Sequence, residues 1–240
     1  MIQIDKNNLP KHIAITMDGN GRWAKEKGKL RIFGHENGVE AVRETVTAAA
    51  KIGIEFLTLY AFSTENWNRP KNEINSLMHL LVLAIKKETK TLMENNIRLR
   101  TIGNTDSLPE KAKKELNSTI KKTQNNTRMN LILALSYSGK WEIINATKKI
   151  LSDNIAPENL NEKIFQQYLE TKNVPDPELL IRTSGEYRIS NFLLWQIAYS
   201  ELYFTNTLWP DFRRPDLEKA ILNYQSRERR FGKTKEQVKD

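Results

Sequence analysis

Short apolar runs rich in β-branched and aromatic residues recur along the chain and alternate with longer segments of helical pattern. Runs of this kind are typical of buried strands. The six predicted strands are 13–17, 56–62, 97–102, 129–135, 179–181 and 202–204. Strands that are apolar on both faces and separated by helices predict an α/β fold with a largely parallel central sheet and helices on both faces. Ligands of such sheets bind beyond the carboxyl ends of the strands.

Three of the intervening segments carry a helical signature. In segment 36–52 the valines recur at the i, i+3 and i+7 spacing of an amphipathic helix. Ser107 and Glu110 have the spacing of a capping box at the start of a second helix. A third surface helix is predicted at 141–151. These helices would serve as crossovers between parallel strands.

A fourth helix, predicted at about 73–95, is apolar around most of its circumference. In its stretch LMHLLVLAI, residues 77–85, only His79 is polar, and we expect that histidine to be packed. Such a helix is either a central core helix or the wall of an apolar cavity. At a rise of 1.5 Å per residue the segment would run roughly 35 Å, enough to wall a deep tunnel.

The composition is that of a soluble α/β protein, expected to form a single domain over 1–240. No apolar run approaches the roughly 20 residues of a membrane span. The absence of cysteine excludes disulfides and thiolate metal sites, and the N-terminal segment lacks the order of a secretion signal, so a cytoplasmic location is expected. The net charge of +9 suits nucleic acid, an anionic membrane surface or phosphate-bearing substrates.

The first candidate site is the stretch HIAITMDGNGRWA, residues 12–24, in which a predicted strand ends at Asp18. Gly19 and Gly21 flank Asn20 and allow main-chain amides to approach an anion. The pattern is neither a P-loop nor a dinucleotide-binding fingerprint. Asp18 could hold a magnesium ion or act as a nucleophile. Nucleophilic phosphatase chemistry is the minor alternative, because the position of its acid/base aspartate is occupied by Asn20.

Two further motifs place polar groups at strand ends. YAFSTENWNRP, residues 60–70, is either a ligand-binding loop or an ordinary capped loop. In IRTSGEYRISNFLLWQIAYSELYF, residues 181–204, Arg182 ends a strand, while Arg188 and Ser190 begin a predicted helix. Arginines and a hydroxyl at a helix N-terminus suit a diphosphate, although a salt-bridge network is a competing interpretation. The aromatic remainder of this motif is either core or an oligomer interface.

These strings, together with FGHENG, LWPDF and RERRFG, resemble the cis-prenyltransferase family over nearly the whole chain. The resemblance implies a parallel sheet, a homodimer and a hydrophobic substrate tunnel. It also implies successive condensation of isopentenyl diphosphate onto an allylic diphosphate such as farnesyl diphosphate, with new cis double bonds. The expected product is a long-chain polyprenyl diphosphate such as undecaprenyl diphosphate, precursor of the cell-wall carrier lipid. A shorter-chain product is the alternative.

The resemblance also implies residue roles. Asp18 would bind the catalytic Mg²⁺, with Glu201 as a second ligand, and Asn66 would assist proton removal. The allylic diphosphate site would comprise Gly19, Asn20, Gly21, Arg22, Arg31 and His35, with Trp23 beside the substrate. The loop after the second strand would contribute Ser63, Thr64, Glu65, Trp67 and Arg69. The isopentenyl diphosphate clamp would comprise Arg182, Arg188, Ile189 and Ser190.

The chain departs from the family pattern at a few positions. Tyr187 stands where some relatives carry histidine, so it is not counted as a metal ligand. Ser136, Ser138 and Lys140 also depart from the usual residues, and no substrate contact is assigned to them.

Two other classes of function fit the sequence less well. A nucleic-acid or membrane-surface binding protein needs exposed cations and aromatics on one face, whereas here the motif arginines lie at strand ends and the aromatics lie in apolar runs. A noncatalytic partner subunit would lack Asp18. We therefore expect an enzyme that does not bind nucleic acid and that contacts the membrane peripherally when it releases product.

Overall fold

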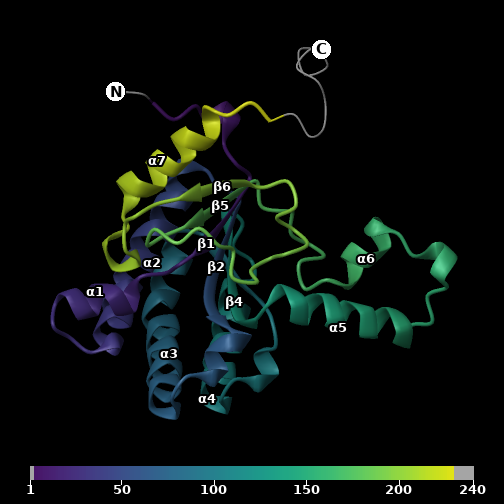
Figure 1. The fold of residues 1–240 in the computed structure, drawn as a ribbon, viewed down its shortest axis with the longest axis horizontal. Helices are drawn as coiled ribbons and strands as arrows, with labels where there is room; N and C mark the ends of the chain where they lie inside the picture. The colour runs from purple at the N-terminus through teal and green to yellow at the C-terminus, as the bar shows by residue number, and fades with distance from the viewer. Residues whose placement is uncertain (1–2, 230–240) are drawn as a thin grey trace.

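The computed structural model describes residues 3–229, which form an open six-stranded sheet (Figure 1). Every neighbouring pair of strands is parallel, and the strand order is β3-β4-β2-β1-β5-β6. The strands are β1 (His12–Thr16), β2 (Phe56–Ser63), β3 (Ile97–Ile102), β4 (Met129–Tyr137), β5 (Leu179–Arg182) and β6 (Glu201–Phe204). All six strands predicted from the apolar runs are confirmed.

Helices α1 and α2 connect β1 to β2, α3 connects β2 to β3, α4 connects β3 to β4, and α7 follows the last strand, β6 (Figure 1). They are α1 (Asn20–Glu26), α2 (Arg31–Ile52), α3 (Lys71–Glu94), α4 (Glu110–Thr123), α5 (Gly139–Ser152), α6 (Glu162–Tyr168) and α7 (Arg214–Gln225). Helices α5 and α6 project sideways from the body of the molecule (Figure 1). Among the described residues, no helix combines the length and hydropathy that a membrane crossing requires.

The larger apolar core lies between the sheet and helices α2, α3, α4 and α7. Helix α2 packs closely on α1, because a side chain at Gly34 would place its Cβ only 1.9 Å from the Asn20 carbonyl oxygen. Glycine at this position therefore allows the start of α1 to lie directly against α2. Helix α3 lines a cavity through its apolar face, but His79 lies exposed on its outer side, so the expectation of a packed histidine was wrong.

A smaller apolar cluster covers the opposite face of the sheet. It joins Tyr137 at the end of β4 to Phe192 and Trp141, the latter in the first turn of α5. The rings of Tyr60 and Phe192 stack with their centroids 4.3 Å apart. This cluster fixes segment 183–200, which carries the third candidate motif, against the carboxyl half of β2 and β4.

Two local predictions were wrong. Ser107 does not cap α4: the helix starts after Pro109, and the Ser107 hydroxyl instead donates a hydrogen bond to the Asn104 carbonyl and lies within hydrogen-bond distance, 2.8 Å, of the Ser136 hydroxyl. Segment 188–200 forms turns rather than a helix. Three residues near its start, Ser190, Asn191 and Leu193, have positive φ angles of 50°, 62° and 50°, which an α-helix cannot include.

His12, the first residue of β1, is buried and fully hydrogen-bonded. Its Nδ1 lies 2.6 Å from the Pro175 carbonyl oxygen, and its Nε2 lies 2.7 Å from the Thr58 hydroxyl. Because a carbonyl can only accept, Nδ1 carries the proton and Nε2 accepts from Thr58. Burial lowers the pKa of His12 to about 4, so the ring is neutral near pH 7.

Candidate active site

Asp18 lies just beyond β1. Hydrogen bonds of its main-chain amide and carbonyl help to hold the loop in place. The Thr183 hydroxyl accepts a hydrogen bond from the Asp18 amide at 2.8 Å and donates one to the Asp18 carbonyl at 2.7 Å. The amide of Trp209 donates to the same carbonyl at 3.0 Å. Gly19 follows with a φ of 108°, in the left-handed region that favours glycine. The loop thus presents a fixed carboxylate whose side chain is 34% exposed.

Arg182, the last residue of β5, is the buried cation beside Asp18. Parallel pairing sets it level with Thr16 on β1, so both strands end at the same edge of the sheet. Its guanidinium, only 3% exposed, donates to Asp18 Oδ2 at 2.8 Å and to Ser190 Oγ at 2.8 Å. Its Nε is buried and makes no hydrogen bond. No protein group among the described residues satisfies this donor, so a water, an ion or a ligand is needed to pair with it.

Arg22 and Arg188 lie farther from the centre of the site. Arg22 donates to the Ser184 carbonyl at 2.9 Å, pairs with Glu186 at 3.1 Å and lies 3.7 Å from Asp18. Arg188 also pairs with Glu186, and its side chain is largely exposed. Only the backbone carbonyl of Arg188 reaches Arg182, at 2.6 Å. Arg22 and Arg188 therefore both pair with Glu186, and neither side chain joins the buried group formed by Arg182, Asp18 and Ser190.

The loop after β2 contributes a second group of polar side chains. Ser63 and Asn66 form a reciprocal capping box, in which the Ser63 amide donates to Asn66 Oδ1 at 3.1 Å. Glu65 accepts a hydrogen bond from Asn191 at 2.8 Å; although burial opposes it, hydrogen bonding of this kind lowers the pKa of Glu65. Trp67 turns away, packs edge-on against Phe62 and donates to Ser136.

Three cationic or aromatic groups gather around one carboxylate where α2 and α3 begin. Glu73 lies 3.4 Å from the Arg31 guanidinium and 3.1 Å from that of Arg69. One carboxylate thus serves two arginines and leaves an excess of positive charge. Burial, reinforced by both arginines, lowers the pKa of the neighbouring His35 to about 4. His35 Nε2 and Asn20 Oδ1 are buried without hydrogen-bond partners.

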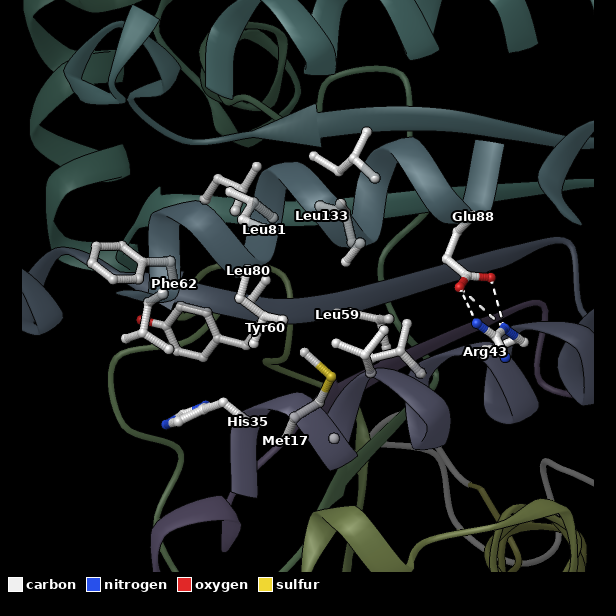
Figure 2. A pocket seen from close by; sticks show the side chains of 18 of the residues that line it. Met17, His35, Arg43, Leu59, Tyr60, Phe62, Leu80, Leu81, Glu88 and Leu133 are labelled. Carbon is white, nitrogen blue, oxygen red and sulfur yellow. Dashed lines mark hydrogen bonds and ion pairs between the residues drawn. The ribbon is translucent and has the colours of Figure 1, made fainter. Parts of the chain in front are cut away.

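These groups line two hollows that share part of their wall. The polar one, about 630 Å³, is lined at the carboxyl edge by Asp18, Ser63, Glu65, Asn66, Arg69, Arg182 and Ser190, among others. The apolar one, about 250 Å³, runs between the sheet and helices α2 and α3. Met17, Tyr60, Asn66 and Arg69 border both hollows. Figure 2 shows the apolar cavity, with His35 and Tyr60 at one end and Arg43 and Glu88 at the other.

Comparison with known proteins places the chain. A family model described as "Putative undecaprenyl diphosphate synthase" matches residues 16–232. An isoprenyl transferase of Chlorobaculum tepidum is 57% identical over 96% of this chain and 89% of its own. A ditrans,polycis-undecaprenyl-diphosphate synthase of Pasteurella multocida, specific for (2E,6E)-farnesyl diphosphate, is 52% identical over 98% of this chain and 100% of its own.

The chain belongs to this prenyltransferase family. The fold agrees with a solved structure of a family enzyme. The crystal structure of lavandulyl diphosphate synthase from Lavandula x intermedia, in complex with dimethylallyl diphosphate, superposes with a TM-score of 0.92 at 36% identity, covering 95% of this chain and 100% of that one. The α/β fold with a parallel sheet is therefore that of a prenyltransferase.

The remaining predicted site residues lie outside the two hollows. Trp23 stacks on Phe33 with a centroid distance of 5.7 Å and does not face either hollow. Gly21 lies against Arg31, since a Cβ there would come within 3.2 Å of the guanidinium. The other predicted residues that line neither hollow are Gly19, Arg22, Arg31, Thr64, Trp67, Arg188 and Ile189.

Glu201 is the predicted residue that the structure separates most clearly from Asp18. It begins β6 level with Leu179, whereas Asp18 follows Thr16, which lies level with Arg182. Glu201 is therefore at the opposite edge of the sheet, and it pairs with Arg227 at 2.6 Å. The expectation that Glu201 and Asp18 share one metal ion is not met within this chain.

Several site residues escaped the sequence analysis. Lys140 and Asn191 line the polar hollow, and Glu73 and Thr183 hold the groups around it. Lys140 follows β4, which pairs with β2, so its position past a strand end was a usable signal. Glu73 carried no such signal, because its role depends on arginines from two other elements.

Proposed function

We propose that the chain is a cis-prenyltransferase that condenses isopentenyl diphosphate onto farnesyl diphosphate and yields a long-chain polyprenyl diphosphate, undecaprenyl diphosphate in particular. One observation carries the proposal: a polar hollow lined by Asp18, Arg69 and Arg182 shares part of its wall with an apolar cavity. A diphosphate with a hydrocarbon tail needs both parts side by side. The farnesyl specificity of the Pasteurella relative supports the choice of starter.

The allylic diphosphate is assigned to the mouth of the apolar cavity. Arg31 and Arg69 share Glu73 there, so an incoming diphosphate supplies the negative charge that the cluster lacks. His35 Nε2 and Asn20 Oδ1, both buried and unsatisfied, face the same region. The neutral His35 can donate a hydrogen bond from Nε2 if its other nitrogen is unprotonated. The hydrocarbon tail then lies along the apolar cavity.

The isopentenyl diphosphate is assigned to the polar hollow. Arg182 offers its unsatisfied Nε, Ser190 a hydroxyl and Lys140 an ammonium group. The fork of Arg182 is already oriented by Asp18 and by the Arg188 carbonyl, so little side-chain entropy is lost when a phosphate binds. The two diphosphates would meet near Asn66 and Arg69, which border both hollows.

Condensation breaks the allylic carbon–oxygen bond, and the diphosphate leaves with the electron pair. The double bond of isopentenyl diphosphate supplies the electrons of the new carbon–carbon bond, and a proton is lost from its C2 carbon. The arginines stabilise the charge that develops on the leaving diphosphate, and removing one such group typically costs about 3–4 kcal/mol. Asn66 is a poor base, and its Oδ1 already accepts from the Ser63 amide. We assign Asn66 to orientation of the diphosphate that takes the proton.

Asp18 is the residue we assign to Mg²⁺. The described residues contain no cluster of three or more acidic or histidine side chains that could enclose a metal. Mg²⁺ fits a different arrangement, in which one or two carboxylates and substrate phosphates share the ion. The fixed, partly exposed carboxylate of Asp18 suits that arrangement. When bound, the ion would neutralise charge on the departing diphosphate.

We also propose a homodimer, as the family resemblance implies. Helix α5 projects from the body of the molecule and exposes Ile144 and Leu151, which are 57% and 69% accessible. Exposed apolar side chains on a projecting helix are suited to covering by a second copy. Light scattering coupled to size-exclusion chromatography would report a mass near 56 kDa for a dimer of this 27.9 kDa chain; a monomer mass would contradict the proposal.

The decisive experiment is an assay of the purified chain with Mg²⁺, farnesyl diphosphate and labelled isopentenyl diphosphate, followed by sizing of the extracted product. We expect a labelled polyprenyl diphosphate of about eleven isoprene units. Replacement of farnesyl diphosphate by a saturated alkyl diphosphate is the control, because it cannot form an allylic cation. Absence of any labelled polyprenyl product would contradict the proposed function.

A further inference from the structure

The apolar cavity is too small for a long product. A cavity of about 150 Å³ in another protein holds one benzene molecule. By that measure the 250 Å³ cavity of this chain holds on the order of ten carbon atoms, fewer than the fifteen of a farnesyl group. A chain that elongates inside the protein must therefore widen the cavity. The length it reaches depends on how far the walls can separate.

The two walls differ in how they can move. One wall is the sheet, where β2, β3 and β4 are joined by parallel backbone pairing and include Leu59 and Leu133 (Figure 2). The other wall consists of α2 and α3, which contact each other along a seam. Separating hydrogen-bonded strands breaks backbone hydrogen bonds, whereas helices can shift by rearranging side chains. Widening is therefore concentrated at the seam between α2 and α3.

Two ion pairs cross this seam, one near each end of the cavity. Near the mouth, Arg31 of α2 meets Glu73 of α3 at 3.4 Å. At the far end, Arg43 of α2 meets Glu88 of α3, with both its residues in the cavity lining (Figure 2). Arg31 and Arg43 are twelve residues apart, which corresponds to roughly 18 Å along the helix. The seam is thus fastened near both ends.

The far pair is the stronger of the two. Arg43 Nε lies 3.0 Å and 2.9 Å from the two Glu88 oxygens, and its NH2 group also donates to Oε1. Glu40 accepts from the remaining nitrogen of Arg43 at 2.6 Å. The side chains of Arg43 and Glu88 are only 28% and 14% exposed. A hydrocarbon offers neither charge nor hydrogen bonds, so it cannot replace either partner when the helices part.

We propose that the Arg43–Glu88 ion pair is a latch on the outer wall of the cavity and limits the length of the polyprenyl product. This inference rests on the proposed function. Each added isoprene unit gains burial but moves α2 and α3 farther apart. Elongation stops when the free energy needed to separate Arg43 from Glu88 exceeds the free energy gained by burying another isoprene unit. Weakening the latch therefore lengthens the product.

The test is the product-length distribution of latch variants, measured with farnesyl diphosphate, Mg²⁺ and labelled isopentenyl diphosphate. Glu88→Gln removes one charge while keeping the side chain's size, and Arg43→Gln removes the opposite charge with a shorter side chain. We expect the main product of each to lengthen by at least one isoprene unit. The double variant Arg43→Glu/Glu88→Arg restores an ion pair across the seam; because its new carboxylate lies beside Glu40, we expect a product shorter than that of either single variant but not a full return to the wild-type length.

A matched control lies on the same helix. Lys90 and Glu94 form an ion pair within α3 at 3.7 Å, exposed and outside the cavity lining. Glu94→Gln should leave product length unchanged. Melting followed by circular dichroism checks folding, and Arg43→Lys, which keeps the charge but loses the two-pronged contact, replaces any glutamine variant that fails to fold and should give a smaller lengthening.

The outcomes separate the two proposals. If wild-type protein makes polyprenyl product but the folded latch variants make the same or shorter chains, the latch is contradicted while the proposed function stands. If Glu94→Gln lengthens the product as much as Glu88→Gln, the effect is a general one of helix α3 and the latch is contradicted as well. If the wild type makes no product, it is the proposed function that fails.

Discussion

The two ends of the apolar cavity use the same kinds of residue for different purposes. At the mouth, Glu73 divides one negative charge between Arg31 and Arg69, and His35 and Asn20 keep unsatisfied polar atoms. At the far end, Arg43 makes a two-pronged contact with Glu88 and a further hydrogen bond to Glu40, so its charge is fully compensated within the protein. An arginine with a shared partner is available to a ligand, whereas an arginine with its own carboxylate is part of the framework. The partner, rather than the residue type, distinguishes a binding group from a structural one.

Loss of the Asp18 carboxylate, at the carboxyl edge of the sheet, should have the largest effect on activity. We expect Asp18→Ala to lower kcat about 10³-fold. The variant should still fold, because the backbone contacts of Asp18 to Thr183 and Trp209 remain, but its melting temperature should fall, because the buried Arg182 loses its ion pair and the Gly19 amide loses its acceptor. Single-turnover assays at saturating substrates measure the loss of activity. Asp106→Ala, an exposed aspartate before α4, is the control. Activity within tenfold of the wild type would contradict the role of Asp18.

Two histidines allow a second comparison, because His35 lies at the mouth of the cavity and His12 is buried in the interior. His12 and His35 both have pKa values lowered to about 4, from 6.5, by burial. Because their folded-state pKa values are depressed, the unfolded chain binds more protons below pH 6.5. The free energy of unfolding should therefore fall as the pH drops from about 6.5 to 4, by roughly 2–4 kcal/mol for His12. Urea titrations at several pH values measure the slope, and His12→Asn should flatten it.

Added inorganic diphosphate should change the pKa of only one of these two histidines. The ion raises the pKa of His35, which faces the mouth, and leaves that of His12 unchanged, since Thr58 and Pro175 enclose that ring. The chain has only three histidines, so proton NMR can follow each ring. Equal shifts of both pKa values, or none, would contradict the assignment of the allylic diphosphate to the mouth.

Much of this arrangement could be predicted from the sequence. All six strands carried short runs rich in apolar residues, and parallel pairing brings their carboxyl ends together, so Asp18, Asn66 and Arg182 were expected at one edge. The apolar pattern of 77–85 left two alternatives open, and the cavity lining decides for a cavity wall. The short-range pattern of apolar residues was sufficient to predict an element wherever that pattern agrees with its tertiary packing.

The failures of prediction share a different physical cause. The helix expected after Arg188 is absent because tertiary contacts hold Ser190 and Asn191 in left-handed conformations, which composition does not indicate. Strand register places Glu201 at the edge of the sheet opposite Asp18 of the same chain, which its sequence position did not indicate. The partners of Arg31 and Arg43 lie 42 and 45 residues away on another helix. Long-range pairing decides each of these cases.

Replacing the buried clamp conservatively should have an intermediate effect. Arg182→Lys keeps the charge but loses the fork that reaches Asp18, Ser190 and a backbone carbonyl together. We expect a rise of about 30-fold in the KM for isopentenyl diphosphate, equivalent to about 2 kcal/mol, with little change in the KM for farnesyl diphosphate. Arg213→Lys is the control for general loss of a partly buried arginine. Equal changes in both KM values would show that Arg182 does not distinguish the two diphosphates.

The smallest effect tests the comparison of the two ends most directly. Arg31→Ala removes a cation that is 59% exposed and only loosely paired at 3.4 Å. We expect the KM for farnesyl diphosphate to rise about five- to tenfold, since an exposed phosphate contact is worth on the order of 1 kcal/mol, with no change in product length. Arg214, also 59% exposed and paired within α7, provides the matched control, Arg214→Ala. A change in product length with an unaltered KM would mean that the Arg31 pair acts as the Arg43 pair does, and that the difference between mouth and far end does not hold.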